Sequence, residues 1–254
     1  MATDPSPQSG KKRRRAEVYF QVNESAFWRK HSANYPKKTK HSARRLPLWQ
    51  RGHRGRQVKL GIVSDIHCNT AGLRQALELM GEIDELICLG DSIYEYRFSN
   101  EVVQLLKDRE AYVILGNHEE CFFGPQGARA RARDGIDPAL AEWLADQPHR
   151  AELMAHGRRV LLVHSTPWEP RGTYVHPESG LLARFAEAEA DIVLYGHTHQ
   201  QLVRRVGNVL VINPGSAGEA RDHRNGRQLS CAVLDAASEE VRVIDFPDPH
   251  TRCP

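Results

Sequence analysis

Short apolar runs alternate with polar or glycine-containing turns between residues 58 and 246. Apolar runs bounded by turn residues are typical of buried β-strands. On this basis we expect strands over ten segments, namely 58–63, 85–89, 111–115, 151–155, 159–163, 192–195, 201–206, 209–212, 229–234 and 241–244. A short glycine-containing turn follows 151–155 and another follows 201–206, so we expect each of these strands to form a hairpin with the next one.

Apolar residues recur at helical spacing in four of the segments that separate these strands. We expect the first helix to be capped by Thr70 and another to begin with Pro138 at its first position. The remaining two are expected over 100–107 and around 181–185. Strands that alternate with helices and end in hairpins predict an α/β fold, in which two sheets pack face to face with helices outside.

Residues able to bind a metal follow five of these strands or strand pairs. They are Asp65 and His67, Asp91, Asn117 and His118, His164, and His197 and His199. In open α/β sheets the carboxyl ends of strands are where ligands bind, and imidazole and carboxylate are common metal ligands. For one motif taken alone a structural role is equally consistent, with Asp65 as a helix cap and His67 as a loop residue. The recurrence of such residues at strand ends favours one shared metal site.

Charge divides the chain near residue 57. Residues 1–56 contain 15 Lys and Arg against 3 Asp and Glu, a balance of +12, whereas residues 57–254 contain 20 against 29, a balance of −9. The basic segment has too few apolar residues to bury a core, so we expect it to be disordered. We therefore expect a basic extension over 1–56, a folded domain over 57–248 and a short tail over 249–254.

The basic extension has three interpretations. Its charge and its interspersed aromatic residues fit an arm for nucleic acid or another anionic surface. The same composition fits a solvated tail, which we favour because the rest of the chain is acidic and offers no broad nucleic-acid groove. A translation start further downstream would remove part of the segment.

Cysteine usage and hydropathy indicate the compartment. The five cysteines are an odd number, and Cys88 and Cys231 lie within apolar strands, as reduced buried thiols do. No apolar run reaches the length of a membrane span, and the first residues lack the core of a signal peptide. We expect a cytoplasmic protein that does not contact a membrane.

The motifs Asp-x-His, Gly-Asp, Gly-Asn-His-Glu, His and Gly-His-Thr-His, in this order, resemble those of the calcineurin-like metallophosphoesterases. The resemblance covers about 58–246, and the later Asn-Pro-Gly-Ser with Arg221-Asp222 resembles the small prokaryotic phosphodiesterase branch, as does 100–103. It implies a four-layer αββα sandwich with a dinuclear metal site at the strand ends. By this match one metal is held by Asp65, His67, Asp91 and His199, and the second by Asp91, Asn117, His164 and His197. His118 would be the general acid.

The function implied is hydrolysis of a small phosphodiester by a metal-bridging hydroxide, with His118 protonating the departing alkoxide. The resemblance favours two manganese ions, and the same ligands also suit iron, zinc, cobalt or nickel. Cys68 occupies a position where the family usually has a small residue, and a thiol there would be open to oxidation or would alter the metal preference. The alternatives are a phosphomonoesterase for nucleotides or phosphoproteins, a nuclease, and a scaffold without catalysis.

Overall fold

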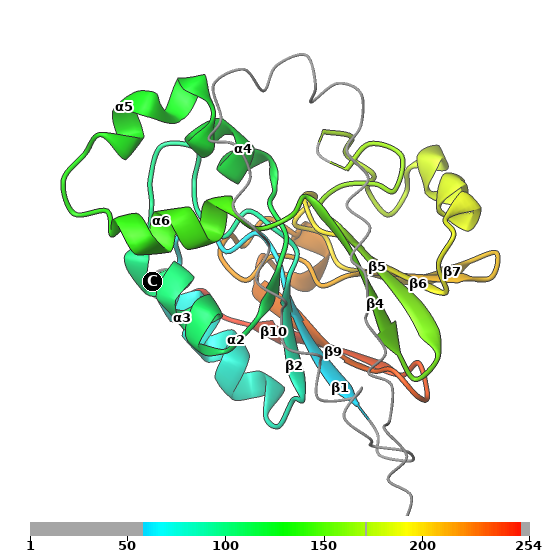
Figure 1. The fold of residues 1–254 in the computed structure, drawn as a ribbon. Helices are drawn as coiled ribbons and strands as arrows, with labels where there is room; N and C mark the ends of the chain where they lie inside the picture. The colour runs from blue at the N-terminus through cyan, green and yellow to red at the C-terminus, as the bar shows by residue number, and fades with distance from the viewer. Residues whose placement is uncertain (1–57, 171, 250–254) are drawn as a thin grey trace, which may run out of the picture. The chain divides into compact units, whose positions relative to one another are not determined.

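The computed structural model describes residues 58–170 and 172–249 (Figure 1). The basic extension expected over 1–56 lies outside these residues, as does the expected tail except for Pro249.

Two five-stranded mixed sheets form the centre of the described part of the chain. The first sheet has the order β10-β9-β1-β2-β3, with β1 to β3 parallel and β9 antiparallel to both of its neighbours, β1 and β10. Its strands are β1 Lys59–Val63, β2 Glu85–Cys88, β3 Tyr112–Val113, β9 Leu229–Asp235 and β10 Val241–Phe246. The second has the order β4-β5-β6-β8-β7, with β5, β6 and β8 parallel. Its strands are β4 Arg150–Ala155, β5 Arg158–Val163, β6 Ile192–Leu194, β7 Leu202–Val206 and β8 Val209–Asn213.

The two sheets bury one apolar layer between them. Leu60 and Ile62 of β1 share a cluster of buried side chains with Leu162 of β5 and Leu194 of β6. Because side chains alternate along a strand, Val63 belongs to a different cluster, on the helical side of the first sheet. Each such side chain contributes about 1.5–3 kcal/mol when it is fully buried. This packing holds the ends of β1, β5 and β6 at a fixed separation.

Helices cover the outer faces of both sheets. Figure 1 shows α2, α3 and α6 beside the first sheet, and their apolar side chains join its outer cluster. On the second sheet, Leu182 and Phe185 of the 3-10 helix η3 pack against Val163, Val193 and Tyr195. The predicted four-layer αββα sandwich is therefore confirmed. The helices are α2 Thr70–Met80, α3 Asn100–Asp108, α4 Asn117–Phe123, α5 Ala128–Arg131, α6 Pro138–Ala145, η2 Pro125–Gly127, η3 Gly180–Glu187 and η4 His223–Asn225.

The cap of helix α2 and the length of strand β3 differ from the prediction. Asn69, not Thr70, caps α2, because its side-chain oxygen accepts a hydrogen bond from Gly72 N at 2.8 Å. The third strand is also shorter than 111–115. It ends early because Leu115 N donates to Pro148 O at 2.8 Å, outside the sheet.

Two helices differ from the prediction as well. The helix expected around 181–185 has 3-10 geometry over its whole length. Helix α4 was not predicted, and it begins at Asn117, inside the Gly-Asn-His-Glu motif. The motif therefore lies on the first turn of a helix.

The helices and the thiols of the described residues bear on hydropathy and on cysteine usage. None of the helices within 58–170 and 172–249 is long and apolar enough to cross a membrane. Cys88 and Cys231 are buried free thiols, as expected, and Cys68 and Cys121 are half-buried free thiols. Burial raises the pKa of Cys88 above its usual range and that of Cys231 to about 12.

Candidate metal centre

The eight residues singled out at strand ends meet at one edge of the two sheets. Asp65 and His67 follow β1, Asp91 follows β2, and His164 follows β5. The remaining four are Asn117 and His118 after β3, and His197 and His199 after β6. The structure brings seven of them together in two neighbouring groups and places His118 at their border.

The first group, called the Asp65 group, consists of Asp65, His67 and His199. The Nε2 atoms of the two imidazoles are 3.1 Å apart, and His199 Nε2 is 3.3 Å from Asp65 Oδ1. The other oxygen of Asp65 accepts hydrogen bonds from Ser64 Oγ at 2.5 Å and His197 N at 3.0 Å. Oδ1 is buried and has no hydrogen-bond donor among the described residues. The group therefore offers one carboxylate oxygen and two nitrogens to a single point.

The second group, called the Asp91 group, consists of Asp91, Asn117, His164 and His197. His164 Nε2 lies 3.1 Å from His197 Nδ1, 3.0 Å from Asn117 Oδ1 and 3.2 Å from Asp91 Oδ2. Asp91 also forms a third set of mutually close donors with His67 and His118. Asp91 is therefore close both to the histidines of its own group and to His67 of the Asp65 group.

Backbone conformation aims these side chains at the centre. Asp65, His67, Asp91, His197 and His199 have φ angles of 53°, 48°, 51°, 66° and 56°. Positive φ is uncommon for residues other than glycine and costs about 1–3 kcal/mol at each position. The surrounding packing maintains these strained turns. At each turn the strand ends, and the side chains of the residues that follow it lie at the site.

Gly116 permits the close approach of Asp91 to the Asn117 turn. A Cβ atom at this position would lie 2.2 Å from Asp91 Oδ1 and 2.7 Å from Asp91 N. Only glycine fits there without moving the backbone. The glycine of the Gly-Asn-His-Glu motif is therefore required by packing against the carboxylate.

The two carboxylates of the site are strongly paired. Burial alone would raise the pKa of Asp65, but the imidazoles of His199, His164 and His67 together outweigh it, and the pKa is lowered. Asp91 shows the same balance with His164, and its pKa is also lowered. Burial opposes a charge on His164, yet Asp91 raises its pKa to about 10, and Asp65 likewise raises the pKa of His199. Both carboxylates are therefore held in the ionised form that a metal requires.

The other two imidazoles are held neutral. Burial lowers the pKa of His67 to about 4, although Asp65 opposes the shift. Burial also lowers the pKa of His197 to about 4, and the neighbouring His164 lowers it further. A neutral imidazole keeps a lone pair on one nitrogen, so both rings are ready to bind a cation. Ionised carboxylates, neutral imidazoles and an amide oxygen together form a donor set that suits divalent transition metals.

Glu119 fixes the loop that carries Asp91. Its buried carboxylate accepts hydrogen bonds from Asp91 N at 2.9 Å, Ser92 Oγ at 2.7 Å, Ile93 N at 3.1 Å and Gly116 N at 2.8 Å. Four donors from two turns thus converge on one side chain. Glu119 is part of the Gly-Asn-His-Glu motif, and no role was predicted for it from the sequence. Glu119 is the third residue of the helix that begins at Asn117. A glutamate at this position of a capping box accepts a hydrogen bond from the backbone of the N-cap residue, so this spacing was a signal for its role.

The Asn-Pro-Gly-Ser turn supports the other side of the centre. Asn213 Nδ2 donates to Gly196 O at 2.8 Å and to Thr198 Oγ1 at 3.1 Å, within the Gly-His-Thr-His turn. Ser216 Oγ donates to Asp65 O at 2.8 Å. The late motif therefore acts by bracing the turns that carry Asp65 and the histidines after β6.

His118 lies at the border of the centre and is partly exposed. Its backbone N donates to Asp91 Oδ1 at 2.9 Å, and its Nε2 is 3.8 Å from Asp91 Oδ2. Its Nδ1 faces Glu95, whose backbone N donates to it at 3.2 Å and whose Oε2 lies 2.5 Å away. Glu95 thus holds the ring with Nε2 directed towards Asp91. Glu95 was not predicted from the sequence, because it lies in a loop without periodicity.

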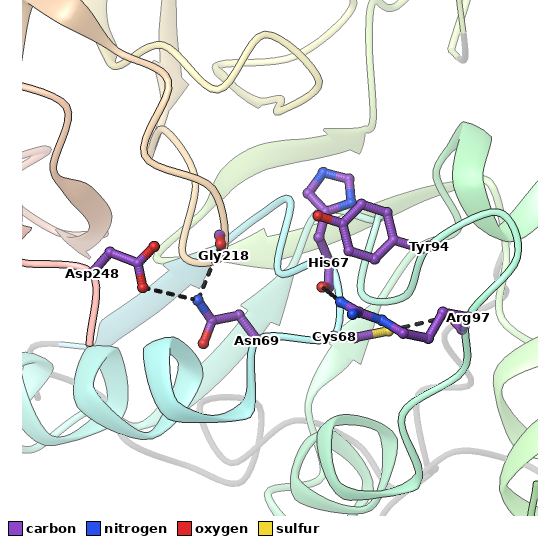
Figure 2. A pocket seen from close by; sticks show the side chains of 7 residues that line it. All are labelled: His67, Cys68, Asn69, Tyr94, Arg97, Gly218 and Asp248. Carbon is purple, nitrogen blue, oxygen red and sulfur yellow. Dashed lines mark hydrogen bonds between the residues drawn. The ribbon is translucent and has the colours of Figure 1, made fainter. Parts of the chain in front are cut away.

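Two tyrosines flank the centre, and a polar pocket adjoins it. Tyr94 stacks on His67 with ring centroids 4.8 Å apart, and Tyr174 stacks on His197 at 3.8 Å. Figure 2 shows the pocket, which has a volume of about 420 Å³. It is lined by His67, Cys68, Asn69, Tyr94, Arg97, Gly218 and Asp248.

Cys68 belongs to the wall of this pocket. Its thiol donates to Arg97 O at 3.2 Å, and burial raises its pKa (Figure 2). The neighbouring Arg97 guanidinium donates to His67 O at 3.1 Å. The thiol is therefore hydrogen-bonded to a backbone carbonyl, and it does not belong to the donor groups around Asp65 and Asp91.

The fold and the donor groups define a class of protein: an α/β sandwich that holds a histidine–carboxylate metal centre at its strand ends. The family model for the calcineurin-like phosphoesterase superfamily domain matches residues 58–239, and the chain belongs to this family. It is accordingly a hydrolase that acts on phosphoester bonds.

Known proteins are similar to the chain in sequence or in fold. The chain is 25% identical over 191 residues to phosphodiesterase MJ0936 of Methanocaldococcus jannaschii, a match that covers 74% of this chain and 98% of that protein. Its fold is similar to that of a metallophosphoesterase from Sphaerobacter thermophilus, with a TM-score of 0.61, 21% identity, and 76% and 90% of the two chains covered. The structure of PH1004 from Pyrococcus horikoshii is also similar, with a TM-score of 0.63, 19% identity, and 76% and 89% coverage.

Proposed function

We propose that the protein is a metal-dependent phosphodiesterase that uses two divalent metal ions. The observation that carries the proposal is that Asp91 is close both to the histidines of its own group and to His67 of the Asp65 group, with His118 Nε2 directed towards it. In this proposal the Asp65 group and Asp91 hold one ion, and the Asp91 group holds the other. When bound, such ions would lower the pKa of a water for attack on phosphorus and neutralise charge on the phosphate oxygens.

The residues of the centre favour an anionic substrate. Its donor groups contain two carboxylates, Asp65 and Asp91, and the remaining donors are neutral when they bind a metal. Two dications would therefore leave a positive centre after the protein charges are counted, and this attracts a phosphodiester. The neighbouring polar pocket suits a hydrophilic ester group better than a lipid chain.

His118 is assigned the role of general acid in this proposal. It lies beside the donor groups, and Glu95 contacts its Nδ1, so Nε2 is free to deliver a proton to the departing alkoxide. The adjacent residue, Asn117, contributes its side-chain oxygen to the Asp91 group. One helical turn thus supplies both a donor to the metal centre and a proton donor.

Manganese is the metal that we propose, mainly because the family resemblance favours it, and donors of imidazole, carboxylate and amide without thiolate suit it. The same donors also suit iron, zinc, cobalt and nickel. We place the reaction within residues 57–248 and assign no nucleic-acid role to residues 1–56. The cytoplasmic location stays a prediction.

The proposal is tested by an assay after metal exchange. The full chain is stripped with a chelator, reloaded with manganese, and assayed with bis(p-nitrophenyl) phosphate and p-nitrophenyl phosphate. We expect the diester to be hydrolysed faster, and chelation to lower turnover by at least about 1000-fold, since metal ions supply several kcal/mol of transition-state stabilisation. Manganese should restore the activity.

Other results would replace the proposal. Faster hydrolysis of the monoester would make the protein a phosphomonoesterase. Hydrolysis that continues after chelation would show that the reaction does not depend on a metal ion. Absence of turnover with both compounds and with a panel of nucleotides would favour the alternative of a scaffold without catalysis.

A further inference from the structure

Glu219 occupies a loop that is tied to the Asp65 turn. Its backbone N donates to Ser216 Oγ at 2.8 Å, and the same hydroxyl donates to Asp65 O at 2.8 Å. The side chain of Glu219 is 17% exposed. Its carboxylate is therefore held at a fixed distance from the Asp65 group.

His199 presents its second nitrogen to this carboxylate. Its Nε2 faces Asp65 and His67, whereas its Nδ1 lies 3.6 Å from Glu219 Oε2. Both facing atoms are buried, and His199 Nδ1 makes no hydrogen bond within the described residues. A histidine that binds a metal through Nε2 carries its proton on Nδ1, and this proton needs an acceptor. The gap exceeds a hydrogen bond by roughly 0.7 Å, which a small rotation of either side chain closes.

Two further side chains hold Glu219 in place. The hydroxyl of Tyr94 donates to Glu219 Oε1, and Arg221 Nη2 forms an ion pair with Oε2. The Tyr94 ring stacks on His67, as Figure 2 shows, and the Arg97 guanidinium lies over the Tyr94 ring at 4.7 Å. Glu219 is thus connected to both imidazoles of the Asp65 group, through Nδ1 of one and through the tyrosine stacked on the other.

The Asp91 group has a different support. His164 Nδ1 is 2.7 Å from Leu89 O, a backbone carbonyl that no substitution removes. No contact of the Glu219 side chain with a residue of the Asp91 group is present among the described residues. A change at Glu219 should therefore act on one of the two groups.

We propose that Glu219 is a positioning residue, which orients His199 for the metal ion of the Asp65 group and keeps Tyr94 on His67. The proposal rests on the two-metal function above. Loss of such an outer carboxylate typically lowers metal affinity about 10- to 100-fold. The loss should fall on one ion and spare the other.

Cobalt(II) titration of the metal-free full chain, followed by visible absorption, tests this. We expect two binding steps in the natural protein. Glu219→Ala should weaken one step about 10- to 100-fold and change its absorption band, with the second step unchanged. Glu219→Gln keeps an oxygen acceptor for Nδ1–H, so it should recover most of the affinity. Tyr94→Phe should give a smaller loss at the same step.

Glu178→Ala makes the same change at an exposed glutamate and serves as the matched control. Two unchanged steps in Glu219→Ala would overturn the positioning role while leaving the proposed function intact. Equal weakening of both steps, or a glutamine variant as poor as the alanine variant, would also overturn it. A natural protein that binds no cobalt would instead overturn the two-metal function and this proposal with it.

Discussion

Replacing Asp91 with asparagine should lower turnover by at least about 1000-fold and remove bound metal. Asp91 is the only carboxylate shared between the donor groups of the described residues, and its ionised form also pairs with His164 at 3.2 Å. Asparagine has nearly the same shape but no charge, so attraction for two dications is lost. Metal ions contribute several kcal/mol to such reactions, and about 4 kcal/mol corresponds to the 1000-fold loss.

Turnover of bis(p-nitrophenyl) phosphate and metal content per chain measure this effect. Asp108→Asn, at an exposed position near the end of α3, is the matched control and should match the natural protein. Full metal content in the Asp91→Asn variant would contradict the bridging role. So would a loss of activity below tenfold.

Replacing His118 with alanine should lower turnover about 100- to 10,000-fold while metal content stays at the natural level. The reason is that its imidazole contacts Glu95 and lies beside the donor groups, and the Asn117 oxygen that faces His164 is on the neighbouring residue. A proton donor matters most for a poor leaving group. The loss should therefore be larger for an alkyl ester than for an aryl ester, whose leaving group departs without protonation.

Parallel measurements of turnover with alkyl and aryl diesters, and of metal content, separate this role from that of Asp91. His223→Ala removes an exposed imidazole and is the matched control. If His118→Ala lost metal as Asp91→Asn is expected to, or lost equal activity with both leaving groups, the proton-donor role would be wrong.

The positions of the donor residues were predictable because they depend on the regular part of the fold. Apolar runs located β1, β2, β5 and β6, and the carboxyl ends of parallel strands meet where ligands bind. Residues that follow those runs directly, such as Asp65 and Asp91, could therefore be expected at one place. The strained φ angles that aim them have no periodic signal, so the turn geometry could not be derived.

Contacts made by loop residues were not predictable. Glu95, Glu219 and Tyr174 reach the centre from segments without periodicity, and their partners lie far away in the sequence. The cap of α2 was missed because Asn69 and Thr70 are neighbours with similar capping ability, and only the hydrogen bond to Gly72 distinguishes them. Tertiary packing decided these details.

Diffraction from crystals of the full chain loaded with manganese, recorded at the manganese absorption edge, tests the central claim most directly. We predict two anomalous peaks per chain with Asp91 between them. One peak should be surrounded by Asp65, His67 and His199, and the other by Asn117, His164 and His197. A single peak in one donor group, peaks outside both groups, or a manganese content well below one ion per chain by elemental analysis would contradict the account.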